Sequence, residues 1–299
     1  MSYRTLLLIV LLVPAALLGG AALLGVRIPV PQLGRDYIQR FEFFEDQTQI
    51  ELPPISGPDD PSRPLVVIDA GHGGRDPGAI GTDSDGKQFT EKSITLAISL
   101  ALRDELLRQG GIRVALTRDD ERILPLPHRP EIARLLDADL FISIHADSAG
   151  SRSDVSGASI YTLSNAASSE AAKRFAAREN DADRLNGITI EGQSDTVSAI
   201  LVELSQQRTQ EDALTFAELV VREGERDLAF VQDPSRAAAL AVLRAPDVPS
   251  VLFESGFVTN INDRAQLTTV QGRARYAGVL ARAIRVYFAR RRDPEAGRE

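Results

Sequence analysis

Apolar stretches alternate with polar, helix-like stretches from Leu65 to the last helix, and this alternation predicts an α/β protein. Short apolar runs rich in β-branched residues predict buried strands, and apolar residues at three- and four-residue spacing predict helices. The expected strands are 65–68, 112–116, 140–144, 158–163 and 250–253, and the expected helices are 91–109, 130–137, an alanine-rich helix ending near 180, 196–206, 209–224 and 271–291. Strands and helices that alternate in this way indicate a mostly parallel, twisted sheet with helices on both faces.

Several details of the helices follow from the same pattern. Thr90 is the expected N-cap of the helix that ends before Gly110-Gly111. In the helix opened by Pro130, Ile132, Leu135 and Leu136 are expected to face inward. One face of the terminal helix is expected to be buried, and it carries Tyr276, Val279, Leu280, Ile284 and Phe288.

The amino-terminal region differs from the rest of the chain. Residues 1–26 contain one positive charge followed by an uncharged apolar stretch of about twenty residues, long enough to span a bilayer. This pattern predicts a secretory signal or an N-terminal membrane anchor, and therefore export to the periplasm; cleavage and retention stay open. Residues 27–64 predict a linker, 65–291 the catalytic domain, and 292–299 a polar tail.

Composition limits the chemistry that the chain can carry out. The formal net charge of −8 argues against nucleic acid as a partner. Cysteine is absent, which excludes thiol catalysis, disulfides and cysteine-based zinc sites. Because the chain has only three histidines, His72, His128 and His145, a metal site would have to include carboxylates.

A glycine-rich loop follows the first buried strand, with His72 between Gly71 and Gly73. The dinucleotide-binding fingerprint requires G-x-G-x-x-G at the start of a helix, and here Asp76-Pro77 interrupts that pattern. The phosphate-binding loop requires G-K-[ST], which this loop lacks. In a parallel sheet, the loop lies at the edge where ligands bind.

Three expected strands end in side chains suited to metal or proton chemistry, namely His72, His145 and Glu254. Glu91 opens the helix after the glycine loop and is expected near the same edge. Two imidazoles and one carboxylate are a common ligand set for catalytic zinc, which leaves a position for water. A remaining carboxylate could act as general base toward water and as acid toward a leaving amine.

Structural alternatives exist for each of these residues. Glu91 could interact favourably with the helix dipole, and Glu254 could accept hydrogen bonds from backbone amides. His128 lies in a proline-rich loop and is expected to be structural, while Arg118, Asp119 and Asp120 are expected to form a solvated turn.

Five motifs in order resemble those of the zinc-dependent N-acetylmuramoyl-L-alanine amidases of the cell-separation type. They are Ile68–Gly81, Glu91-Lys92, Leu116–Asp119, Ala138–Asp147 and Pro249–Asn260. The resemblance implies the Amidase_3, phosphorylase/hydrolase-like fold, with zinc bound by His72, Glu91 and His145 and with Glu254 as the catalytic glutamate. It also implies hydrolysis of the amide between the lactyl group of N-acetylmuramic acid and L-alanine in peptidoglycan, during daughter-cell separation.

The resemblance further implies regulation. Residues 181–200 are similar to an insertion that plugs the zinc site in some members, with Glu191 or Asp195 standing in for water, and an activator with a LytM-type domain would displace it. A mobile polar loop without contact to the metal is the alternative. For the whole chain, the alternatives are a non-catalytic peptidoglycan-binding module and a zinc hydrolase of another peptidoglycan amide. The activator's identity, septal targeting and the oligomeric state stay open.

Overall fold

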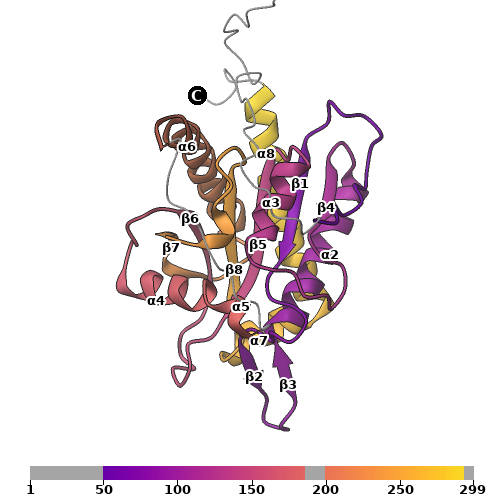
Figure 1. Ribbon diagram of the computed structural model, residues 1–299. Helices are drawn as coiled ribbons and strands as arrows, with labels where there is room; N and C mark the ends of the chain where they lie inside the picture. Colours follow the sequence, from indigo (N-terminus) through magenta and orange to yellow (C-terminus); the bar gives the residue numbers. More distant parts are fainter. Residues whose placement is uncertain (1–49, 186–198, 293–299) are drawn as a thin grey trace, which may run out of the picture. The chain divides into compact units, whose positions relative to one another are not determined.

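A six-stranded sheet in the order β4-β1-β5-β8-β6-β7 forms the centre of the fold (Figure 1). The computed structural model describes residues 50–185 and 199–292, all within one compact unit, Thr48–Glu299. The strands are β1 Leu65–Ala70, β4 Arg113–Leu116, β5 Leu140–Asp147, β6 Ala158–Leu163, β7 Phe230–Ala238 and β8 Ser250–Phe257. All neighbouring strands are parallel except β6 and β8, which are antiparallel. A separate hairpin joins β2 Ile80–Thr82 to β3 Gln88–Thr90.

Helices cover both faces of the sheet, as the sequence predicts. The helical segments are α2 Glu91–Gln109, α3 His128–Leu135, α4 Glu170–Glu179, α5 Ala182–Leu185, α6 Ala199–Gly224, η2 Ala241–Leu243, α7 Ile261–Thr268 and α8 Val270–Arg292. Alternate residues of β1 point to opposite faces. Val66 and Ile68 pack in a core with α2, α6 and α8, whereas Leu65 and Val67 pack in a second core with α3, α4 and η2.

Strand register places the expected site residues at one edge. Ala70 of β1 pairs with Ile144 of β5, and His145 of β5 pairs with Glu254 of β8. The carboxyl ends of these three parallel strands therefore meet, and α2 begins beside them at Glu91. The mostly parallel α/β architecture is confirmed.

Other details of the prediction were wrong. The two helices expected over 196–206 and 209–224 form, within the described residues from Ala199 on, one continuous helix, α6, because the polar stretch that joins them contains no glycine or proline. Helix α3 starts at His128 rather than Pro130, and Leu135 is 40% exposed instead of inward. The strand β7 was not predicted, because Pro234 and the polar residues around it do not form the apolar pattern of a buried strand; proline is compatible with β7 because this strand lies at the edge of the sheet.

The expected linker and terminal segments are only partly described. Within residues 50–64, Ser56 pairs with Val114 of β4, and the carbonyls of Pro61 and Arg63 accept hydrogen bonds from Arg113. Residues 1–49 lie outside the described part, as do 293–299. Among the described residues, none of the helices has the length and apolar character needed to cross a bilayer.

Candidate metal centre

His72 lies in the loop directly after β1, in a left-handed backbone conformation with a φ of +61°. Its Nδ1 atom is 2.7 Å from Asp76 Oδ2, which leaves Nε2 directed toward Glu91 and Glu179. Burial disfavours a charged imidazole, but the carboxylates of Glu91 and Asp76 outweigh this effect and raise the pKa of His72 well above its usual value. A carboxylate on one ring nitrogen orients the other nitrogen as a metal ligand.

Glu91 connects the two histidines. Its Oε1 atom lies 3.0 Å from both His72 Nε2 and His145 Nδ1, and it also accepts a hydrogen bond from the amide of Ala146. Oε2 accepts a hydrogen bond from the amide of Ala79. Burial would raise the pKa of Glu91, yet the two imidazoles lower it strongly. Glu91 is therefore part of the site and not only a favourable charge at the start of α2.

His145 lies near the carboxyl end of the buried strand β5, with its ring centroid 4.9 Å from that of His72. A β-carbon at Gly71 would lie 2.5 Å from His145 Cε1 and Nε2, so only glycine leaves room for this ring. Gly78, with a φ of +62°, has the same role on the other side, where a β-carbon would lie 2.7 Å from His72 Cδ2. Glycines in the loop thus allow the imidazoles to approach the backbone closely.

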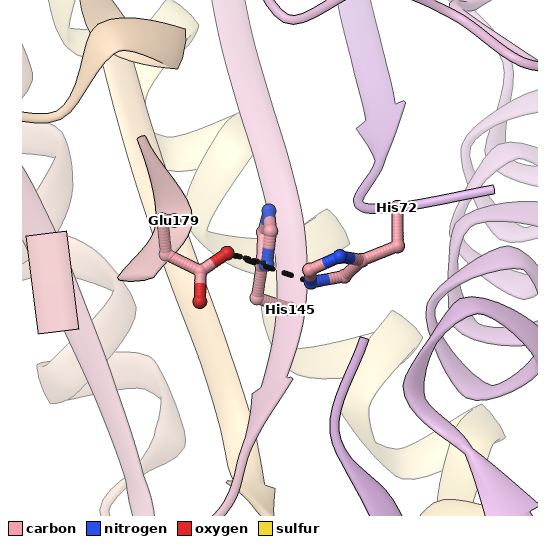
Figure 2. Close-up of side chains that lie close together, drawn as sticks. All are labelled: His72, His145 and Glu179. Atoms are coloured by element: carbon pink, nitrogen blue, oxygen red, sulfur yellow. Dashed lines mark ion pairs between the residues drawn. The ribbon is translucent and has the colours of Figure 1, made fainter. Parts of the chain in front are cut away.

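Glu179, the last residue of α4, also reaches the histidines (Figure 2). Its Oε2 lies 3.4 Å from His72 Nε2 and 3.3 Å from His145 Nδ1. Burial raises the pKa of this carboxyl group. Sequence reasoning missed Glu179 as a site residue, because nothing in a helix-ending Arg-Glu-Asn distinguishes a ligand from a solvated charge. The only available signal was its position at the start of the expected insertion.

Glu254 lies beside this group, on β8, and is 3% exposed. Neither of its carboxylate oxygens has a hydrogen-bond partner among the described residues, so the alternative in which it binds backbone amides is wrong. Burial, together with the nearby charges of Asp147 and Glu91, raises the pKa of Glu254 well above its usual value. A carboxyl group with a raised pKa holds a proton more readily than an ordinary glutamate, which suits a group that must accept a proton and then return it.

The donor atoms fit a divalent cation. The ligand atoms of His72, His145 and Glu179 lie within 4.8 Å of one another, and the separations involving Glu91 are 3.0 Å. Zinc bound tetrahedrally at about 2.0–2.1 Å separates its nitrogen and oxygen ligands by about 3.3 Å. His72 Nε2 is buried and makes no well-aligned hydrogen bond within the described chain, although Glu91 Oε1 lies only 3.0 Å away, as expected of two atoms that could share a cation.

The remaining candidates lie elsewhere. His128 begins α3 and is not in the cluster of candidate metal ligands found among the described residues. Glu191 and Asp195, the expected plug residues, lie outside the described residues. The solvated turn expected at 118–120 was wrong for Arg118, which is 1% exposed, because its guanidinium turns inward to bind backbone carbonyls.

Comparison with known proteins identifies the family of the chain. Residues 66–286 match the family model Amidase_3, described as N-acetylmuramoyl-L-alanine amidase. The chain is 38% identical over 228 residues to the amidase AmiA of Salmonella typhimurium, covering 76% of this chain and 77% of that protein. It is 34% identical over 229 residues to AmiC of Escherichia coli, again covering 76% of this chain but only 54% of AmiC, so it spans about half of that relative.

Solved structures give the same assignment. The amidase AmiC2 of Nostoc punctiforme superposes with a TM-score of 0.53 at 27% sequence identity, and the match covers 76% of this chain and 98% of that structure. Because the family model covers most of the described domain, including the loop of His72 and the strands of His145 and Glu254, the chain belongs to the N-acetylmuramoyl-L-alanine amidase family.

Proposed function

We propose that this protein is a zinc-dependent N-acetylmuramoyl-L-alanine amidase, with His72, Glu91 and His145 as metal ligands and Glu254 as the catalytic residue. Family membership supports the amidase activity on peptidoglycan. The observation that carries the assignment of residues is the convergence of two imidazole nitrogens on one oxygen of Glu91, each 3.0 Å away. When bound, zinc would supply Lewis acidity toward a carbonyl and would make water more acidic.

Glu254 supplies the proton chemistry in this proposal. Its unpaired carboxylate takes a proton from the attacking water, whose oxygen adds to the lactyl carbonyl carbon. The bond from that carbon to the L-alanine nitrogen then breaks, and Glu254 returns the proton to the departing amine. A raised pKa suits both transfers, since the group must accept and release one proton in each cycle.

Glu179 is proposed to keep the site closed. Its oxygen lies against both histidines, in a position that substrate or water would need. Neighbouring residues hold it in place, because Arg178 pairs with Asp147 at 2.5 Å and the Asn180 side chain bonds the backbone of Ala239 and Ala241. We extend the plug expected at 181–200 to include this end of α4. A LytM-domain activator would displace it, in competition with these polar contacts.

The cellular setting is also proposed. We place the protein in the periplasm, acting on peptidoglycan in cell separation, with residues 1–26 as an export signal or an inner-membrane anchor. The amidase relatives support the substrate.

Digestion of purified sacculi tests the proposed function. Wild-type protein and Glu254→Gln are compared for bound metal and for released products. We expect both to retain about one zinc ion per chain, and only the wild type to release stem peptides that begin with L-alanine. Cleaved crosslinks would instead indicate another amide as the substrate. Absence of any product, also in a Glu179→Ala background that would open the site, would indicate a non-catalytic binding module.

A further inference from the structure

His72 adopts a backbone conformation that side chains rarely take. Its φ of +61° lies in the left-handed region, where the β-carbon crowds the backbone. Residues persist in this region only where the surrounding structure fixes them. Because the imidazole must be directed at Glu91, whatever holds this backbone also sets the geometry of the proposed metal site.

Two buried arginines donate hydrogen bonds to the backbone on both sides of Gly71. Arg129 donates from Nη1 to the carbonyl of Ala70 and from Nη2 to the carbonyl of His72, both at 2.8 Å. Arg118 donates from Nε to the same carbonyl of Ala70 at 2.9 Å and from Nη2 to that of Gly71 at 2.8 Å. Three consecutive carbonyls, from the end of β1 to the ligand itself, are therefore bound by guanidinium groups.

Arg118 also fixes the helix that carries Glu91. Its Nη2 donates to the carbonyl of Lys92 at 2.9 Å and to Thr95 Oγ1 at 3.2 Å. Thr95 Oγ1 in turn donates to the carbonyl of Gly71. One guanidinium thus joins the first turn of α2 to the loop of His72, and it sets the position of two proposed ligands relative to each other.

The charges show that these arginines are not explained by ion pairing alone. Arg129 pairs with Asp69 at 2.9 Å, whose carboxylate also accepts bonds from Thr117 and Ser143. Arg118, by contrast, directs its hydrogen bonds within the described chain to backbone carbonyls and one hydroxyl. Burial, aided by the charge of Arg129, lowers the pKa of Arg118 to about 10. Burial of a charge is costly unless hydrogen bonds compensate for it, and for Arg118 the acceptors of these bonds are mainly the backbone carbonyls beside His72 and Glu91.

We propose that Arg118 and Arg129 are positioning residues, which hold the 70–72 backbone so that His72 is preorganised to bind the metal. This inference rests on the proposed metal site. Lysine should not substitute functionally for either arginine. The planar guanidinium group donates to two carbonyls at once, whereas a single ammonium group cannot keep the same geometry.

Metal affinity tests the proposal without relying on turnover. Zinc dissociation constants of the wild type, Arg118→Lys and Arg129→Lys are measured by competition with a chelator, and the absorption spectrum of the cobalt-loaded protein reports coordination geometry. We expect each variant to bind zinc 10- to 100-fold more weakly and to show an altered cobalt spectrum, as is typical when groups that orient a ligand are changed.

Two controls separate positioning from general stability. Arg113→Lys removes a guanidinium that also donates to two carbonyls, those of Pro61 and Arg63, but away from the site. Leu106→Ala destabilises the core about 22 Å along α2 from Glu91. Both controls should keep the wild-type zinc affinity and cobalt spectrum, even where Leu106→Ala lowers the melting temperature.

The outcomes are distinguishable. If the wild type binds no zinc, the proposed function fails. If the wild type binds zinc and the folded lysine variants bind it within twofold of the wild type, the positioning role is refuted. Arg118→Gln and Arg129→Gln are tested in parallel, and failure of all four variants to fold would also refute the proposal, because the two arginines would then serve the fold as a whole.

Discussion

The contact between Asp183 and Leu126 offers a test of closure that leaves the metal ligands untouched. Asp183 of α5 is 7% exposed, and both of its carboxylate oxygens accept from the amide of Leu126, at 2.9 and 3.1 Å. Leu126 lies in the loop before α3 and lines the cavity beside the histidines. Asp183→Ala therefore removes one of the contacts that hold the Glu179 segment over the site.

The size of the effect can be derived from this hydrogen bond. A bond with a charged partner contributes about 1.5–3 kcal/mol. Burial raises the pKa of Asp183, so part of this energy is offset by desolvation and the lower value is the better guide. Since 1.4 kcal/mol corresponds to about a factor of ten in an equilibrium constant, the open population should rise about tenfold.

Release of dye from labelled sacculi, without any activator, measures the open population. We expect Asp183→Ala to raise this basal rate about tenfold, and Glu170→Ala, which removes an exposed carboxylate at the other end of α4, to leave it unchanged. In a Glu179→Ala background, Asp183→Ala should add little, because the inhibitory oxygen is already gone. An unchanged basal rate in a folded, zinc-loaded Asp183→Ala protein would refute the closure mechanism.

Three further predictions concern the metal site. Gly71→Ala should abolish zinc binding measured by metal analysis, because the new β-carbon would lie 2.5 Å from the His145 ring; full zinc content would contradict this. Asp76→Asn should weaken zinc binding by about 10- to 100-fold in a chelator competition, because Asp76 orients His72 through Nδ1; an unchanged affinity would show that the contact is dispensable. In the chelator-treated protein, the pKa values of His72 and Glu254 are raised, so the folded state binds more protons than the unfolded state and stability present at pH 5.5 is lost toward pH 8. Calorimetry should show this fall in melting temperature. The stabilisation by added zinc should grow over the same pH range, because the ligands bind metal when they are deprotonated. A melting temperature of the metal-free protein that rises with pH would contradict the assignment.

The position of the proposed metal site could be predicted from the sequence because the rules of parallel sheets are simple. Residues that follow the carboxyl ends of neighbouring strands must lie together, so His72, His145 and Glu254 could be placed at one edge before any coordinates were known. Glu91 follows from the helix that returns from that edge. The glycines of the loop around His72 have a simple steric reason, because the rings of His72 and His145 occupy the space that side chains at Gly71 and Gly78 would need.

The residues that sequence analysis missed depend on tertiary contacts with no local pattern. Arg118 follows β4 in a stretch that is otherwise solvated, since Asp119 and Asp120 are exposed. Its guanidinium reaches the carbonyls of Ala70 and Gly71 only because the fold places the end of β4 next to the loop of His72. Glu179 is similar, because the position of α4 over the site depends on loop lengths and on polar contacts far apart in sequence, such as Arg178 with Asp147. Charged residues of this kind have no periodicity that marks them as buried.

Closure and metal binding must be linked in this site, because Glu179 approaches the same two nitrogens that the proposed zinc would share. Any factor by which Glu179 strengthens metal binding is, by reciprocity, the factor by which the metal stabilises the closed segment. The charges give the direction, since Glu91 and Glu179 lie close together and repel each other when no cation is bound. A bound metal therefore favours closure, and the contacts of Arg178, Asn180 and Asp183 need to supply only the remaining stabilisation. An activator that opens the site must then overcome both the polar contacts and the loss of Glu179 as a ligand. Its binding should therefore lower the affinity of the protein for zinc by the same factor by which zinc lowers the affinity of the protein for the activator.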